Sequence, residues 1–157
     1  MTVSKKKCGR YTIERITSLE QFTGELCLWL REGGKKAATH VYGSPLKMED
    51  FNWIDFARHS YLSVCFKDGR PVGAMLASMF VSDFDPETRI LMQDSLYVTE
   101  PGCRAAHFLL HEFIDFGKSN AKHIITVIGP HTNIKGRSLE KLGFKKTDVH
   151  YRLEVQG

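Results

Sequence analysis

The chain has 157 residues, of which 42% are hydrophobic and 25% are charged, and its formal net charge is +4. These values are typical of one globular domain that is long enough to bury a core. No apolar run approaches the length of a membrane-spanning helix, and the basic start of the chain lacks the apolar segment of a secretory signal. We therefore expect a cytoplasmic protein with a single domain over residues 1–157, of which residues 1–9 form a flexible tail.

The basic residues form short clusters at residues 5–7, 35–36 and 145–146, without interleaved aromatic side chains. We interpret these clusters as solvated surface and do not expect nucleic-acid binding, which would show a steep dependence on salt. The cysteines show no paired spacing, so we expect reduced thiols. They are Cys8, Cys27, Cys65 and Cys103.

The first third of the chain predicts one strand and two helices. Residues 10–16 alternate in polarity, as a strand does. Residues 18–21 carry a capping-box pattern, so a helix should begin there and end at Gly33 and Gly34. A loop is expected over residues 35–47 and a second helix over residues 47–59. Because that helix is apolar on most of its surface, either deep packing or contact with a substrate or a second subunit could cover it.

The middle of the chain predicts three strands. Residues 61–66 and 72–81 are joined by residues 67–71, whose Asp-Gly pair predicts a hairpin. The second of these strands is apolar on both faces and should be central in the sheet. A polar loop over residues 82–87 then returns the chain, antiparallel, into an apolar strand over residues 90–98 that carries a few polar groups.

A turn at residues 99–102 follows this strand, and residues 104–116 show the apolar spacing of a helix. Such a turn leaves backbone N–H groups unpaired at the helix start and directs the positive end of the helix dipole outward, which suits a bound phosphate. The small residues Ala105 and Ala106 would let a ligand approach the backbone, and Arg104 adds a positive charge.

The rest of the chain predicts a strand, a short helix and a last strand. Residues 122–128 form a strand that the helical crossover makes parallel to residues 90–98. The short helix ends in residues 140–144, and alternation over residues 149–155 predicts a strand with one covered face. The fold class is therefore α/β (α+β), with one mixed, mainly antiparallel sheet and helices on both faces. The apolar second helix and last strand leave a homodimer open.

This order of elements, with Leu-Tyr-Val at residues 96–98, Pro-Gly-Cys-Arg at residues 101–104 and Leu-Glu-Lys-Leu-Gly-Phe at residues 139–144, resembles the GNAT superfamily of acyl-CoA-dependent N-acetyltransferases. Among its members the chain is most similar to the short bacterial or phage-type ones. The resemblance implies a splayed pair of parallel strands, with the pyrophosphate of coenzyme A on the turn and helix start and its pantetheine arm on the strand backbone. It also implies transfer of an acetyl group from acetyl-CoA, as co-substrate, to a primary amine by direct attack.

The resemblance assigns cofactor binding to the end of one strand, to the helix start and to the loop after the parallel strand. These residues are Leu96, Tyr97, Val98, Arg104, Ala105, Ala106, His107, Phe108 and Asn133. The chain departs from the family pattern, because counting from Arg104 places His107 and Leu109 where small residues are usual. A shorter turn would give those roles to Ala105 and Ala106.

Two polar residues in mid-strand, Gln93 and Asp94, lie near the position where family members often carry a carboxylate or a water-holding group. Burial of Asp94 on an apolar face would raise its pKa and suit it to accept a proton. The residues that share its strand parity are Ile90, Met92, Leu96 and Val98. A purely structural role, in which Asp94 accepts a hydrogen bond from neighbouring backbone or caps a helix, is the equally open alternative.

The departing thiolate also needs a proton. The family often has a tyrosine where this chain has Leu139, which leaves Tyr97, Tyr151 or water as donor. His107 and His111 are four residues apart and could meet on one helix face, but no third ligand is evident and we expect no metal. The main alternative to an enzyme is a GNAT-fold protein that has lost catalysis and serves in binding or assembly.

Overall fold

The computed structural model describes residues 5–42, 52, 55–57, 60–100, 103–128 and 134–147. Contacts between residues divide the chain into two compact units, Met1–Val127 and Ile128–Gly157. The first unit carries the sheet and the longer helices, and the second carries the short helix α4 (Gly136–Lys141). No helix within these described ranges is long and apolar enough to cross a membrane.

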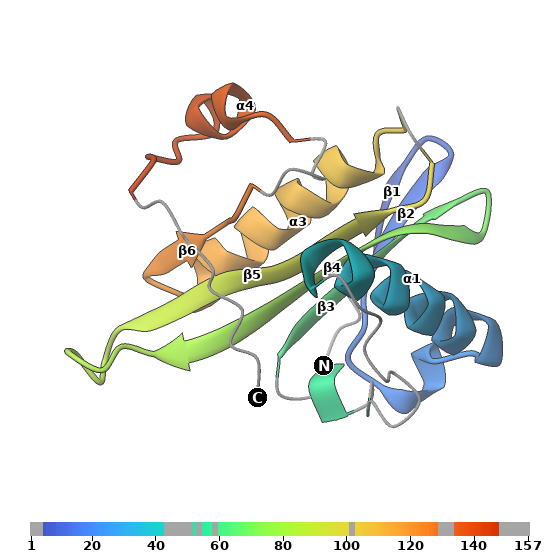
Figure 1. Cartoon of the computed structure of the whole chain (residues 1–157), viewed down its shortest axis with the longest axis horizontal. Helices are drawn as coiled ribbons and strands as arrows, with labels where there is room; N and C mark the ends of the chain where they lie inside the picture. Colours follow the sequence, from blue (N-terminus) through green and yellow to red (C-terminus); the bar gives the residue numbers. More distant parts are fainter. Residues whose placement is uncertain are drawn as a thin grey trace. The chain divides into compact units, whose positions relative to one another are not determined.

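A six-stranded mixed sheet forms the centre of the first unit, with its strands in sequence order (Figure 1). The strands are β1 (Lys5–Cys8), β2 (Tyr11–Arg15), β3 (Tyr61–Lys67), β4 (Arg70–Val81), β5 (Arg89–Val98) and β6 (His123–Ile125). All neighbours pair antiparallel except β5 and β6, which pair in parallel. The predicted mixed, mainly antiparallel sheet is therefore confirmed.

The two long helices, α1 (Gly24–Tyr42) and α3 (Ala105–Asn120), cover opposite faces of this sheet (Figure 1). On the α1 face, Leu26 and Leu30 pack with strand residues such as Leu62 and Val64. The α3 face is built from the alternate strand residues. Tyr61, for example, lies with its ring centroid 5.7 Å from that of Phe113. The alternation of the central strands thus supplies two apolar cores, one for each helix.

The first helix differs from its prediction at both ends. The capping box at Ser18 and Gln21 is present, but it begins a short 3-10 helix (Leu19–Gln21), and α1 starts only at Gly24. The predicted end at Gly33 and the loop after it are wrong, because α1 continues to Tyr42. A Cβ atom at Gly33 would lie 2.6 Å from Cε1 of Tyr97. This glycine therefore allows close helix–sheet packing and does not end the helix.

Two predicted elements fall largely outside the described residues. Of the second helix, residues 55–57 are helical, and the last strand over residues 149–155 is not described at all. The helix predicted over residues 104–116 is confirmed and extends to Asn120. The strand predicted over residues 122–128 is shorter, as β6 ends at Ile125.

Residues 5–8 form the edge strand β1, although the sequence analysis placed them in a flexible tail. The Nζ atom of Lys6 lies 2.7 Å from Oδ2 of Asp115 and 3.1 Å from Oε2 of Glu112, both on α3. The side chain of Glu112 is nearly buried. A run of three lysines has no strand pattern, so this long-range ion pair could not be predicted from the local sequence.

These contacts shift two ionisation equilibria. The hydrogen bond to Asp115 raises the pKa of Lys6, and the hydrogen bond from Lys6 lowers the pKa of Asp115. A lowered carboxyl pKa stabilises the fold above the ordinary pKa of aspartate, and this contribution is lost as the pH falls through the lowered value. The raised pKa of Lys6 stabilises the fold below the ordinary pKa of lysine, and this is lost only at strongly alkaline pH.

We predict that Lys6→Gln lowers the free energy of unfolding near neutral pH by about 1 kcal/mol, because half of the lysine side chain is solvent-exposed and the pair is partly screened. The loss should shrink as the pH falls below about 4 and through the lowered pKa of Asp115, because the carboxylate that pairs with Lys6 is then protonated. Urea unfolding at several pH values measures this. Lys7→Gln, on the exposed neighbour of Lys6, is the control. An equal loss in both variants, or one that does not change with pH, would contradict the role given to Lys6.

Candidate active site

Strand β5 contains a bulge at Asp94. Ser95 pairs with Leu76 and Gln93 pairs with Ala77, so Asp94 is an extra residue without a partner in β4. An extra residue reverses which side chains face which side of the sheet. The side chains that face α3 are therefore odd-numbered before Asp94 and even-numbered after it.

The packing of β5 against α3 agrees with this reversal. Before the bulge, Leu91 approaches Gly117 of α3, where an added Cβ would lie 3.2 Å from Cδ2 of Leu91. After the bulge, Val98 pairs with Gly73, and Gly73 lies beneath Ala105 and the side chain of Leu109. The predicted parity of Asp94 with Leu96 and Val98 is wrong because the bulge lies between them.

Asp94 itself is exposed and lies on the sheet face opposite α3, so the predicted burial is wrong. Its Oδ2 atom accepts a hydrogen bond of 2.6 Å from the hydroxyl of Ser78 in β4. Within the described part of the chain, no Lys, Arg or His side chain forms an ion pair with Asp94. The carboxylate is thus held from one side and open to solvent on the other.

The parallel strands β5 and β6 separate just before this bulge. Their register contains three pairs, from Ile90 with His123 to Met92 with Ile125. At the next position the side chain of Gln93 accepts a hydrogen bond from the hydroxyl of Thr126. Beyond it, among the described residues, residues 95–98 pair only with β4 and Asp94 pairs with no strand. The predicted splayed strand pair is confirmed, and within the described part of the chain one edge of β5 beyond Gln93 has no strand partner.

Gln93 and Asp94 therefore have different surroundings. Gln93 is buried on the α3 face and bridges β5 to Thr126, whereas Asp94 is exposed on the other face. Tyr97 lies on the same face as Asp94, but its ring packs against α1, with its centroid 5.6 Å from that of Trp29. The other two predicted residues, Asn133 and Tyr151, lie outside the described residues.

The first backbone amides of α3 form no hydrogen bond with another described residue. Arg104 is the N-cap residue, without a side-chain cap, and the first helical hydrogen bond runs from the N–H of Phe108 to its carbonyl, at 3.1 Å. The amides of Ala105, Ala106 and His107 therefore precede the helical ladder. The first turn carries no acidic side chain, which leaves the positive end of the helix dipole without a carboxylate of its own.

The bulky residues that depart from the family pattern do not lie over these amides. Leu109 is fully buried and points toward Gly73. His107 is exposed, with its ring centroid 4.3 Å from that of His111. Partial burial lowers the pKa of His107, and the charges of His111 and Arg104 add to this effect. The described residues contain no group of three His, Cys, Asp or Glu side chains arranged to hold a metal ion.

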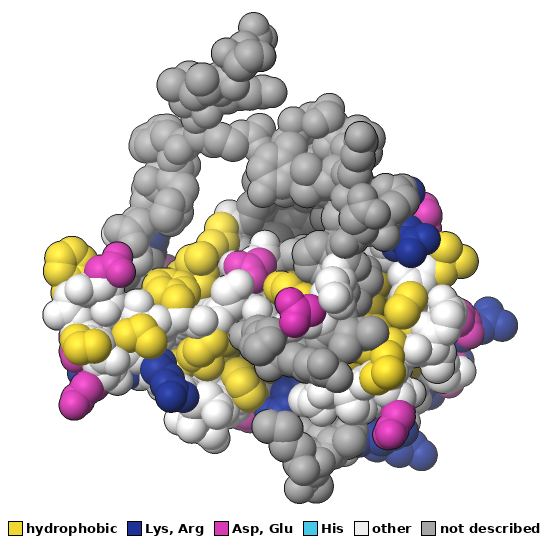
Figure 2. Space-filling model, turned by 90° about the horizontal axis from the view of Figure 1, so that it is seen from below, with side chains coloured by type: hydrophobic (Ala, Val, Ile, Leu, Met, Phe, Trp, Pro, Cys, Tyr) yellow, Lys and Arg dark blue, Asp and Glu magenta, His cyan; other side chains and the backbone are white. Residues whose placement is uncertain are grey.

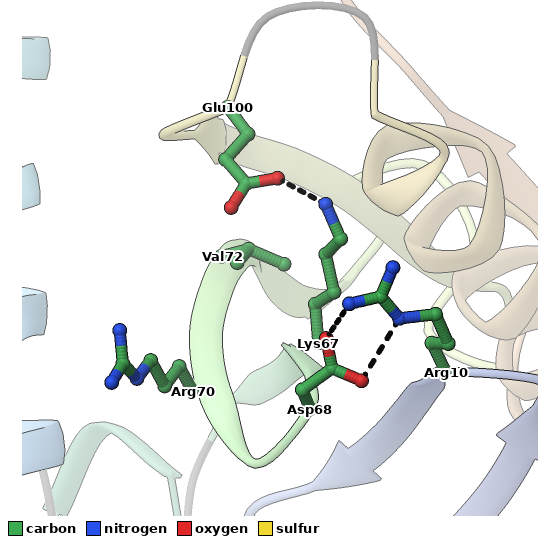
Figure 3. Close-up of a pocket in the computed structure, with 6 residues that line it drawn as sticks. All are labelled: Arg10, Lys67, Asp68, Arg70, Val72 and Glu100. Atoms are coloured by element: carbon green, nitrogen blue, oxygen red, sulfur yellow. Dashed lines mark hydrogen bonds and ion pairs between the residues drawn. The ribbon is translucent and has the colours of Figure 1, made fainter.

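The turn before α3 is tied to the β3–β4 hairpin (Figure 3). The Nζ atom of Lys67 contacts Oε2 of Glu100 at 2.7 Å, and the N–H and hydroxyl of Thr99 both donate to the carbonyl of Val72, at 2.9 and 3.2 Å. These contacts hold the chain where it leaves β5 and so fix the position of the helix start.

The same hairpin forms a shallow hollow of about 340 Å³. Its lining residues are Arg10, Lys67, Asp68, Arg70, Val72 and Glu100 (Figure 3). Asp68 and Gly69 adopt positive φ angles of 50° and 81°, as the predicted Asp-Gly hairpin requires, and Asp68 pairs with Arg10. The Asp-Gly pair predicts this turn, but no local pattern predicts the hollow, because Arg10 and Glu100 reach it from distant parts of the chain.

The sequence matches no protein-family model and no curated protein. Solved structures do resemble the chain. A ribosomal-protein-alanine N-acetyltransferase from Brucella melitensis biovar Abortus 2308 has a TM-score of 0.65 at 16% identity, covering 94% of this chain and 99% of that one. An aminoglycoside acetyltransferase from an uncultured soil metagenomic sample has a TM-score of 0.62 at 13% identity, with coverages of 93% and 99%.

A GNAT family acetyltransferase from Staphylococcus aureus subsp. aureus USA300_TCH1516 has a TM-score of 0.61 at 12% identity, and covers 91% of this chain and 98% of its own. These likenesses extend over nearly the whole length of each chain. The protein therefore has the fold of the GNAT acetyltransferases, as its sequence predicts. At such low identities the likeness concerns the fold, and the chemistry must be argued from the residues of this chain.

We predict that Gly73→Val lowers the free energy of unfolding by about 1–3 kcal/mol, because the larger side chain overpacks the interface between β4 and α3. A Cβ there would lie 3.0 Å from Cδ1 of Leu109, 3.2 Å from Cβ of Ala105 and 3.3 Å from the carbonyl oxygen of Tyr97. Urea unfolding measures the effect. Gly24→Val is the control, because a Cβ at Gly24 meets no atom within 4 Å. Equal stability of the two variants would contradict this seating of the helix.

Proposed function

We propose that the protein is an acetyl-CoA-dependent N-acetyltransferase in which a primary amine attacks the thioester directly. The observation that supports this most is the arrangement of three features along one path. They are the amides at the start of α3, which have no side-chain cap from Arg104, the edge of β5 over residues 94–98, which has no strand partner among the described residues, and the exposed carboxylate of Asp94. The first suits a pyrophosphate, the second an extended amide-bearing arm and the third a proton transfer.

The cofactor would be held mainly by backbone. The amides of Ala105, Ala106 and His107 would donate to the pyrophosphate, with the guanidinium of Arg104 beside them. That guanidinium lies 5.1 Å from the ring centroid of Phe108, which limits its freedom. The pantetheine arm would lie along Leu96–Val98, and Asn133 remains a proposed partner for its amides.

Asp94 would accept the proton of the acceptor ammonium, directly or through water. The amine nitrogen would then attack the thioester carbonyl, forming the C–N bond and breaking the C–S bond. The nitrogen would release a second proton to water, which leaves a neutral amide, and the departing thiolate would take a proton from water or a tyrosine such as Tyr151. Ser78 would position the carboxylate through its 2.6 Å hydrogen bond. Gln93, which the sequence analysis grouped with Asp94 as catalytic, is better placed to fix the separation of the strands through Thr126.

One observation favours the alternative of a GNAT-fold binding or assembly protein without catalysis. Leu139, which replaces the tyrosine usual in the family, is buried at 6% exposure and has no proton to donate. Release of coenzyme A with a panel of amines distinguishes the two functions, because a binding protein should give only the background rate. A single domain, a cytoplasmic location and a homodimer remain predictions.

We predict that Ala106→Glu weakens acetyl-CoA binding at least about tenfold relative to Ala106→Gln, because a carboxylate would repel the pyrophosphate at the helix start. An acidic residue in a first helical turn stabilises the helix, so the variant should stay folded. Isothermal titration calorimetry measures both dissociation constants. Equal affinities in the Glu and Gln variants would remove the proposed phosphate site, and no binding by the unaltered protein would remove the proposed function.

We predict that Asp94→Asn lowers the rate of thiol release about 10²–10⁴-fold at saturating acetyl-CoA, because it removes the proton acceptor. The affinity for acetyl-CoA should not change. Asp83→Asn is the control, since Asp83 is an exposed carboxylate in the loop between β4 and β5. An Asp94→Asn enzyme that keeps its full rate would show that this carboxylate is not the base.

A further inference from the structure

Among the described side chains, α1 packs on only part of the sheet face that carries Asp94. At the end of β5 that leads into α3, this face is covered. Ala74 of β4 lies in the core with α1, Leu76 packs against that core, and Tyr97 packs on Trp29. Past the bulge, toward the tip of the β4–β5 hairpin, four hydrophobic residues share this face. We call Phe80, Ile90, Met92 and Ile125 the hairpin strip.

The strand register places these residues side by side. Phe80 pairs with Ile90, Met92 pairs with Ile125 of β6, and Met92 also pairs with Ser78, whose hydroxyl binds Asp94. Phe80 and Ile125 are each 39% exposed, which is high for large hydrophobic side chains. In Figure 2, hydrophobic side chains are exposed at separate places over the face seen from below. Asp94 lies at the inner end of the strip.

The charges on this face suit a cation. Asp94 forms no ion pair among the described residues, and His123, which is in register with Ile90, lies at the outer end of the strip. The side chain of Arg89 points to the opposite face, because it has the parity of Leu91. A carboxylate beside an apolar surface is complementary to an ammonium group attached to an apolar body.

We propose that the acceptor is a primary amine that carries an aromatic or aliphatic group, bound with its ammonium at Asp94 and its apolar group on the hairpin strip. This rests on the proposed acetyl transfer. Side chains on one face of a strand repeat roughly every 7 Å. A short alkyl spacer therefore lets a ring reach Met92 and then Phe80. A polyamine or an aminoglycoside would instead set charged or hydroxyl groups against residues that cannot bind them.

Steady-state kinetics with 2-phenylethylamine, ethylamine and spermidine test the proposal, with coenzyme A release measured at saturating acetyl-CoA. The value of kcat/KM for phenylethylamine should exceed that for ethylamine by about tenfold or more. Phe80→Ser should remove most of this preference without changing the affinity for acetyl-CoA. Phe80→Leu, which keeps an apolar side chain, should retain part of the preference and guards against a folding defect. Phe84→Ser is the control, because Phe84 is fully exposed in the loop of the same hairpin and should not matter.

Calorimetric binding of phenylethylamine in the absence of acetyl-CoA separates this proposal from the proposed function. Suppose that phenylethylamine binds, that Phe80→Ser weakens this binding and Phe84→Ser does not, and that no thiol is released. This result would support binding of the amine to the hairpin strip and would overturn acetyl transfer. Thiol release that is as efficient with spermidine or ethylamine as with phenylethylamine would overturn the strip and leave acetyl transfer standing. If phenylethylamine neither binds nor is preferred over ethylamine, the hairpin strip does not bind the acceptor, and this result leaves the proposed acetyl transfer untouched.

Discussion

The arrangement of the candidate site depends on one extra residue in β5. Without the bulge at Asp94, the strand would keep one parity along its whole length, and either Leu91 or Val98 would lose its place against α3. The bulge lets both ends of β5 pack on the same helix and brings an unpaired residue to the opposite face. That residue is a carboxylate, and the adjacent hydroxyl of Ser78 fixes its position.

The second constraint is the close packing of α3 on the sheet. Gly73 allows Ala105 and Leu109 to approach β4, and the contacts from Thr99 and Lys67 hold the chain between β5 and the helix. The helix start is thereby fixed at the end of the free edge of β5. Both proposed binding features, the amides and the strand edge, thus belong to the same compact unit, Met1–Val127, which suits a site that must hold a long cofactor in one orientation.

The parts of the fold that depend on local pattern could be predicted from the sequence. The central strands, their Asp-Gly hairpin and the helix after β5 all follow from the spacing of apolar residues and from turn chemistry. The bulge could not be predicted, because an extra residue is recognised only by its pairing with β4, and this led to the wrong burial of Asp94. Strand β1 depends on the ion pairs of Lys6 with α3. The prediction that the helix ends at Gly33 is wrong because this glycine allows close packing against the ring of Tyr97, which is distant in sequence.

The candidate site shows the same division. The helix start was recognised from its small residues and its turn, which are adjacent in sequence. The bridge from Gln93 to Thr126, the support of Asp94 by Ser78 and the hairpin strip all join separate strands and become visible only in the structure. Asp94 is exposed and accepts a hydrogen bond from Ser78, so the burial on which its expected raised pKa depended is absent.

A crystal structure with bound coenzyme A tests the central claim most directly. We predict that the pyrophosphate lies on the amides of Ala105–His107 and that the thiol sulfur lies beside the bulge, near the solvent-exposed carboxylate of Asp94. A cofactor that leaves these amides free, or whose sulfur lies far from Asp94, would contradict it.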